Sequence, residues 1–208
     1  EDVLADRLPD RKQLAALQRE SKILNVEMQR ETETVLYLCI GLAALLTAQL
    51  YSPAEIIMID LDDNRLAMAR KFGATQTVNS SDGKAAAVVK ALTGGKGVDT
   101  AIEAVGIAAT FELCQLLVAP GGVIANIGVH GHKADLHLET LWSQNIAITT
   151  RLVDTATTPM LLKTVQAGKI DPTQLITHHF KLDQILDAYD TFGRAAETKA
   201  LKVIIAND

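Results

Sequence analysis

The sequence has few cysteines and no excess of basic charge, and each scarcity argues against a class of protein. Its 208 residues include two cysteines, Cys39 and Cys114, both in apolar runs. Two thiols cannot form a disulfide framework or a four-cysteine zinc site, so we expect a reducing, cytoplasmic setting. The net charge is −5 and the basic residues are scattered, which argues against a nucleic-acid partner.

The chain also lacks an apolar run long enough to cross a membrane. Residues 35–46 are almost purely apolar, but Thr47 and Gln49 interrupt the run, and a spanning helix needs roughly 20 apolar residues. We recognise no signal peptide at the start. With 48% hydrophobic residues, the chain can bury a sizeable core in one domain with an appendage. We expect no membrane partner.

The first 34 residues contain no glycine, no aromatic residue and one proline. Apolar residues recur there at helical spacing, at Leu14, Leu17, Leu24 and Met28. This pattern predicts an amphipathic helical arm, which either lies on its own domain or forms a short coiled coil. We therefore divide the chain into a helical segment at 1–34, whose origin the sequence leaves open, and a domain at 35–208.

Strand-like and helix-like stretches alternate from residue 35 onward. Short strand-like runs predict strands at Val35–Cys39, Ile56–Ile59, Gln76–Val78, Val98–Glu103, Val123–Ile127 and Ile146–Arg151. Helices are predicted between them at Leu42–Leu50, Asn64–Phe72, Gly83–Leu92, Thr110–Leu117 and Leu138–Ser143. The alternation predicts an α/β fold with a doubly wound, Rossmann-like parallel sheet, which would be followed by C-terminal helices and a closing strand. Such sheets bind ligands at the carboxyl ends of their strands.

One predicted strand ends in a carboxylate at a position typical of dinucleotide-binding folds. Asp60 follows Ile56–Ile59 and lies 19 residues after Gly41. At about this spacing, an acid hydrogen-bonds the ribose hydroxyls of a dinucleotide. The same carboxylate would repel a 2′-phosphate and so favour NAD over NADP. Alternatively, Asp60 and Asp62 merely begin a helix, where the helix dipole favours acids.

A series of motifs follows in a specific order, and together they resemble a known family. They occur at 56–73, 93–99, 102–106, 120–122, 127–131, 171–178, 187–189 and 202–205. The series resembles the cofactor-binding, C-terminal portion of the zinc-type medium-chain alcohol dehydrogenases. The resemblance covers roughly residues 40–208.

The resemblance implies a cofactor role for particular positions. Asp60 would bind the adenosine ribose with Arg65 along its edge, and adenine and ribose would pack against Val105 and Gly106. Main-chain groups at Ile127, Gly128 and Val129 would meet the nicotinamide carboxamide, and Lys202 would reach the cofactor. Alternatively, Gly106 and Gly128 simply end strands, while Arg65 and Lys202 are ordinary solvated cations.

The chain departs from the family where a glycine-rich phosphate loop is expected. If Gly41 is the last glycine of the fingerprint, Leu36 and Leu38 occupy the first two glycine positions and Cys39 the usual proline. Those glycines make the tight turn and let the backbone approach the pyrophosphate. Gly41 still permits close packing of helix on sheet. We therefore expect NAD binding to be weak or lost.

A second departure is the missing front domain, which supplies the zinc ligands and the substrate pocket in the family. Asp6 faintly echoes a zinc ligand, but one carboxylate cannot hold a four-coordinate site. His130 and His132 lack a carboxylate or cysteine at ligand spacing, so they resemble loop residues, although His130 could touch a cofactor. We assign no catalytic and no metal-binding residue, and zinc belongs to the intact family only.

The sequence therefore predicts the cofactor-binding portion of an NAD-dependent zinc-type alcohol dehydrogenase, inactive as an isolated chain. In the intact family, hydride passes between a small alcohol or carbonyl substrate and NAD. Two alternatives stay open: an S-adenosylmethionine-binding Rossmann domain, and a non-catalytic module that self-associates through the arm and the edge strand Ile146–Thr150. The family commonly pairs subunits through that edge, so we expect a homo-oligomer.

Overall fold

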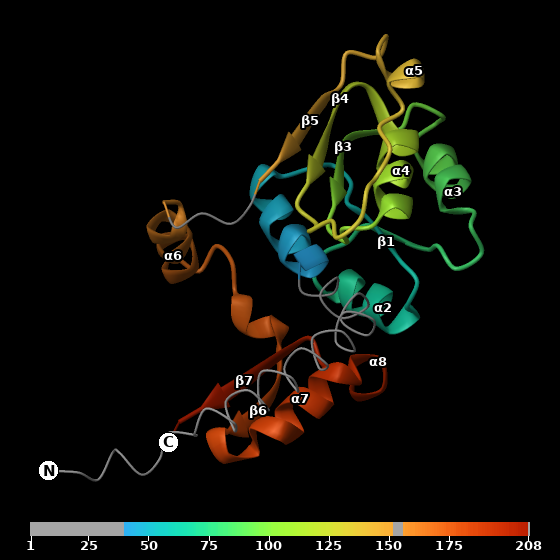
Figure 1. Ribbon diagram of the computed structural model, residues 1–208. Coiled ribbons are helices and arrows are strands. Elements are labelled where there is room, and N and C mark those ends of the chain that lie inside the picture. Colours follow the sequence, from blue (N-terminus) through green and yellow to red (C-terminus); the bar gives the residue numbers. More distant parts are fainter. Residues whose placement is uncertain (1–39, 152–155, 208) are drawn as a thin grey trace, which may run out of the picture.

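A computed structural model describes residues 40–151 and 156–207 of the chain. Helices and parallel strands alternate along it, which confirms the predicted α/β class (Figure 1). The predicted arm at 1–34 and the predicted strand Val35–Cys39 lie outside the described residues.

The described part begins with a helical stretch at 40–48 and a short 3-10 turn, η2 (Gln49–Tyr51). Strand β1 (Ile57–Asp60) then pairs in parallel with β2 (Gln76–Asn79). Helix α2 (Asp63–Lys71) connects them. It begins where it does because the side chain of Asp62 accepts the backbone N–H of Asn64 at 2.7 Å, a typical N-cap.

Three further strands form a second parallel ladder in the order β3 (Val98–Glu103), β4 (Val118–Asn126) and β5 (Ala147–Thr150). The helices around them are α3 (Ala85–Leu92), α4 (Ala108–Leu117) and α5 (Leu138–Leu141). Within residues 40–151 and 156–207, no ladder joins β1 to β3, so the strands form two parallel groups.

Helices cover both faces of the strands, as a doubly wound sheet requires. Strand β1 shows this best, because its side chains alternate. Met58 packs on a cluster built by the helix at 40–48 and α2, whereas Ile57 and Ile59 pack on a cluster from α3 and α4. Figure 1 shows α3 and α4 on one side of β3–β5 and the helix at 40–48, in blue, on the other.

Strand β4 begins five residues earlier than predicted. The sequence predicts this strand at Val123–Ile127, after Pro120-Gly121-Gly122. Instead, β4 pairs Val118 with Val98 and then Val123 with Thr100, leaving the intervening residues as a bulge. Gly121 adopts a φ of +80° there.

The C-terminal part forms a third parallel ladder, of β6 (Ile176–Lys181) and β7 (Lys202–Ala206), with α7 (Ile185–Gly193) packed on both strands. Its other elements are α6 (Thr158–Gln166), η3 (Pro172–Leu175), η4 (Leu182–Gln184) and α8 (Ala195–Thr198). Leu175 and Leu201 join the core cluster of Leu42 and Leu45, so this part packs against the helix at 40–48.

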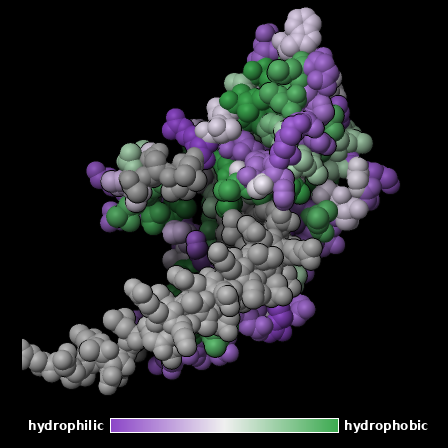
Figure 2. All heavy atoms as spheres, viewed as in Figure 1, coloured by the Kyte–Doolittle hydropathy of each residue, from purple (hydrophilic) through white to green (hydrophobic). Residues whose placement is uncertain are grey.

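Helix α6 buries none of its residues, and Met160, Leu161 and Leu162 are all exposed. Hydrophobic side chains are visible on α6 in Figure 2. None of the helices among the described residues is both long and apolar enough to cross a membrane.

Candidate functional site

The carboxyl ends of β3, β4 and β5 lie in one row. The strand register places Glu103 opposite Asn126, and Asn126 opposite Thr150. Because all three strands run parallel, the loops that follow them open onto the same edge of the sheet. This edge contains most of the positions to which the sequence assigns a cofactor role.

The side chain of Glu103 is fully buried at the end of β3. Its Oε1 accepts the backbone N–H groups of Val105 and Gly106, both at 2.8 Å, and the hydroxyl of Thr110 at 2.7 Å. A buried carboxylate is tolerated when several donors satisfy it. Glu103 therefore holds the loop after β3 and the first turn of α4 around its own side chain.

The backbone of Glu103 also holds the loop after β4. Its carbonyl oxygen accepts the N–H groups of Ile127 at 2.8 Å and Gly128 at 3.0 Å. A Cβ added to Gly106, where φ is +88°, would lie 2.3 Å from the carbonyl oxygen of Val129. One added to Gly128 would lie 2.3 Å from the amide nitrogen of Gly106. Loop packing alone thus requires both glycines, and their cofactor role remains a prediction.

His130 closes the contact between the two loops. Its Nε2 lies 2.8 Å from Oδ1 of Asn126 and 3.3 Å from Oε2 of Glu103. Since Nδ2 of Asn126 donates to the carbonyl oxygen of Gly128, both neighbours of Nε2 are acceptors, and we assign the proton to Nε2. Oε2 of Glu103 has no hydrogen-bond partner, so its contact with His130 is electrostatic rather than a well-aligned bond.

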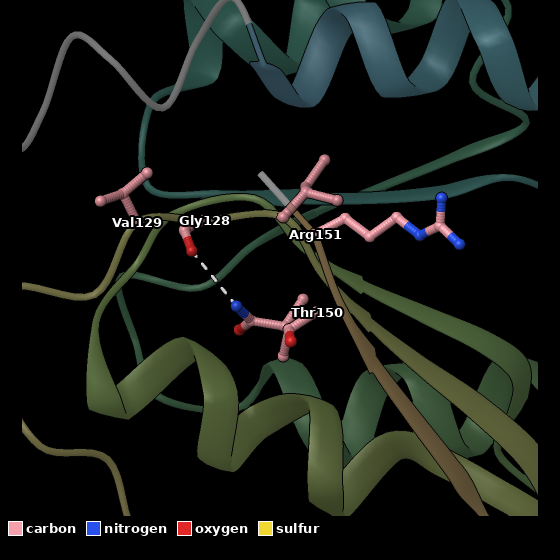
Figure 3. Close-up of a pocket in the computed structure, with 6 residues that line it drawn as sticks. Gly128, Val129, Thr150 and Arg151 are labelled. Atoms are coloured by element: carbon pink, nitrogen blue, oxygen red, sulfur yellow. Dashed lines mark hydrogen bonds between the residues drawn. The ribbon is translucent and has the colours of Figure 1, made fainter. Parts of the chain in front are cut away.

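A pocket of about 270 Å³ lies at the ends of β4 and β5 (Figure 3). It is lined by Asn126, Ile127, Gly128, Val129, Thr150 and Arg151. In Figure 3, the side chain of Arg151 extends away from Gly128 and Val129. Three of the lining residues, Ile127, Gly128 and Val129, are the predicted nicotinamide positions.

Asp60, at the end of β1, forms a compact ionic cluster with its neighbours. Its Oδ1 accepts the N–H of Asp62 at 2.9 Å and lies 3.3 Å from Nη1 of Arg65. Nε of Arg65 lies 3.6 Å from the carboxylate of Asp62. The side chain of Asp60 is 24% exposed and that of Arg65 only 10% exposed, so the carboxylate is the more accessible group. Asp60 also sits beside Asp62, the cap of α2, so helix initiation and ligand binding are compatible.

The remaining two predicted positions lie elsewhere. Lys202 is exposed at the start of β7, opposite Ile176, and does not line the pocket. Gly41 lies in the helical stretch at 40–48, and a Cβ added there would meet only the methyl group of Met58, at 3.8 Å. That is ordinary van der Waals contact, so close packing does not by itself require glycine at this position.

The thiol of Cys114, on α4, is buried and carries no disulfide. Burial and, secondarily, the negative charge of Glu103 raise its pKa to about 12. A thiol in this state stays protonated at neutral pH. Among residues 40–151 and 156–207, no three His, Cys, Asp or Glu side chains are grouped so as to hold a metal ion.

Sequence reasoning missed the group that organises this site. Glu103, Thr110 and Asn126 were not among the predicted site residues, and His130 was considered mainly a loop residue. An acid at the end of an apolar strand ordinarily faces solvent, and no spacing rule indicates that Glu103 turns inward. The available signal was a carboxylate three residues before Gly106 and seven before a hydroxyl, in an otherwise apolar stretch.

Comparisons with known proteins show which proteins this chain resembles. An alcohol dehydrogenase of Cupriavidus necator is 35% identical over 173 residues, covering 80% of this chain and 46% of that protein. The solved apo structure of zinc dependent alcohol dehydrogenase 2 from Streptococcus pneumonia is 57% identical, with a TM-score of 0.77, and covers 81% of this chain and 49% of that one. A protein of Sinorhizobium meliloti 1021 solved with NADP bound is 25% identical, with a TM-score of 0.71, over 81% of this chain and 50% of that one.

These matches have two consequences. The chain spans about half the length of the relatives that it matches. Residues 39–167, more than half of the chain, match the family described as zinc-binding dehydrogenases. The predicted kinship is confirmed, and the chain belongs to the zinc-binding dehydrogenase family.

Proposed function

We propose that this chain is the cofactor-holding portion of an NAD-dependent zinc-type alcohol dehydrogenase and is inactive by itself. One observation carries the proposal: the loops at 105–106 and 127–129 pack backbone to backbone at the carboxyl ends of β3 and β4, beside a pocket. Ligands of doubly wound sheets bind at this edge. The pocket beside these loops, lined by Ile127, Gly128 and Val129 among others, would admit the nicotinamide ring.

The residues present fit a nicotinamide dinucleotide. The backbone of Ile127, Gly128 and Val129 would position the carboxamide, and Val105 with Gly106 would support the adenosine half. When bound, the nicotinamide ring would accept or donate a hydride. The contribution of this chain would be to orient the ring and to exclude water from one of its faces.

Asp60 would select NAD over NADP. Its carboxylate is the exposed member of the Asp60–Arg65 pair and could accept hydrogen bonds from ribose hydroxyls. Arg65 is engaged by both Asp60 and Asp62, so its charge is not free to bind a 2′-phosphate. A phosphate at this position would meet two carboxylates.

Zinc and alcohol chemistry would need residues beyond those described here. Relatives of this chain are about twice its length, and the described residues offer no grouped metal ligands. We therefore derive no step through zinc. The leucines at positions 36 and 38 would further weaken pyrophosphate binding, because leucine side chains would occupy the space that glycine leaves open in the family's phosphate loop.

An activity assay tests the inactivity directly. The purified chain is incubated with NAD and a panel of short primary and secondary alcohols, and NADH formation is followed by absorbance. We expect no turnover above the buffer control. Detectable alcohol oxidation would contradict our proposal. A parallel thermal-shift measurement with NAD and with S-adenosylmethionine tests the alternative of an S-adenosylmethionine-binding Rossmann domain. A shift in melting temperature with S-adenosylmethionine alone would also contradict our proposal.

Self-association is a second candidate property, supported by strand β5. All four residues of β5 are exposed, and within the described residues β5 pairs only with β4. An open strand edge readily pairs with a second copy. We propose a homo-oligomer formed through this edge in the cytoplasm.

A further inference from the structure

We propose that Glu103 is a positioning residue: its buried carboxylate fixes the loop after β3 against the loop after β4 and so sets the shape of the cofactor edge. Its place in a cofactor site rests on the proposed function, whereas its action on the two loops stands on geometry alone. Nothing in the sequence motifs assigns Glu103 a role.

The first step is the cost of burying this side chain. A fully desolvated carboxylate is unfavourable unless donors surround it. Oε1 receives three donors, from Val105, Gly106 and Thr110, at 2.7–2.8 Å. Because two of the three are backbone amides, satisfying the carboxylate fixes the path of the chain at 105–106.

The second step is the coupling to the other loop. Oε2 lies 2.3 Å from the position that a Cβ on Gly128 would take, and 3.3 Å from Nε2 of His130. The Glu103 carbonyl oxygen accepts the amides of Ile127 and Gly128. One residue therefore contacts both loops with its side chain and its backbone, and neither loop can shift without disturbing these contacts.

The two oxygens of the Glu103 carboxylate act differently, so the length of the side chain and its charge can be varied separately. Oε1 acts on 105–106 as an acceptor at a given distance, which a glutamine could also supply. Oε2 faces the Nε2–H of His130, beside which a glutamine could not place a second acceptor. Hence Glu103→Gln keeps the reach and removes the charge, whereas Glu103→Asp keeps the charge and withdraws the oxygens by one methylene.

Amide hydrogen exchange tests the proposal on the full chain without ligand. We expect Glu103→Asp to speed exchange at the Val105 and Gly106 amides about tenfold, as for loss of a buried bond to a charged group. Glu103→Gln should restore most of the protection at these two amides. Val89→Ala is the matched control, because Val89 is buried in the α3 cluster away from both loops.

The outcomes are distinct. The positioning role is supported if Glu103→Asp speeds amide exchange selectively at residues 105–106 and Glu103→Gln restores the protection. Val89→Ala should show no such change after correction for global stability. Unchanged exchange in Glu103→Asp, or an equal change in Val89→Ala, overturns it. NADH fluorescence titration of the Leu36→Gly/Leu38→Gly chain is run alongside: absence of any binding there counts against the proposed function, while the exchange result still decides the role of Glu103.

Discussion

Gly106 lies so close to Val129 that a methyl group on its Cα would stand 2.3 Å from the Val129 carbonyl oxygen. The two residues belong to different loops, which follow different strands. Their contact joins the ends of β3 and β4 into one surface. The candidate cofactor edge is thus a packed unit rather than two independent turns.

Replacing Gly106 by alanine should strongly destabilise the fold. The positive φ and the clash with Val129 add, and we expect a loss of about 2–5 kcal/mol in the free energy of unfolding. Gly83→Ala is the control, because Gly83 has a φ of +71° but no atom within 4 Å of its added Cβ. It should lose about 1 kcal/mol. Urea unfolding of both variants measures the difference, and equal losses would refute the close approach.

Replacing Asp60 by asparagine should shift cofactor preference toward NADP. The change removes the charge that would repel a 2′-phosphate and loosens the contact with Arg65, so we expect the NADP-to-NAD affinity ratio to rise about tenfold. Asp187→Asn is the matched control, since it removes the same charge at an exposed position on α7, which packs on β6 and β7. Calorimetry with both cofactors measures the ratios in the Leu36→Gly/Leu38→Gly chain, where we expect measurable binding. An equal rise of the NADP-to-NAD affinity ratio in the control would show that the net charge of the chain, and not the carboxylate at position 60, sets the cofactor preference.

The Cys114 thiol should make stability depend on alkaline pH. Its pKa is raised from 9.0 to about 12 in the folded state, so the unfolded chain loses the proton first as the pH rises. Stability is therefore unaffected below pH 9 and falls between pH 9 and 12, by up to about 1.4 kcal/mol per pH unit. Urea unfolding at pH 8.5 and 10 checks this against Cys114→Ala, in which that part of the slope should vanish. Identical slopes would contradict the assignment.

Placing a lysine on the open strand edge should block self-association. Ile148 lies on β5 and is 37% exposed, so Ile148→Lys adds a charge that disfavours pairing with a second copy. Light scattering should show an oligomer for the unsubstituted chain and a monomer for the variant. Leu116→Lys, at an exposed position on α4, should leave the mass unchanged. A clean monomer without any substitution would exclude the edge as an interface.

The sequence predicts the strands and helices well where local signals suffice. Val98–Glu103 matches β3 at both ends, because β-type residues that follow Gly97 indicate a strand without tertiary information. The early start of β4 at Val118 was not predicted, because the irregular pairing at 119–122 depends on β3. The pairing of strands depends on register, which no single segment encodes.

The candidate site was predictable only in part. Its glycines at 106 and 128 stand out in the sequence, and the structure brings both to one edge. The inward turn of Glu103 and its approach to His130 could not be predicted, because they arise from contacts between residues 27 positions apart. Lys202 was assigned from resemblance, and the described contacts place it in the β6–β7 ladder.

We propose that this chain keeps the cofactor edge of a zinc-binding dehydrogenase and that its leucines at positions 36 and 38 would impair the binding of NAD. Titration calorimetry with NAD, on the unsubstituted chain and on Leu36→Gly/Leu38→Gly, tests it most directly. We expect weak or undetectable NAD binding by the unsubstituted chain, and NAD binding at least about tenfold tighter by the glycine variant. Low-micromolar affinity in the unsubstituted chain, or no gain in the variant, would contradict the account.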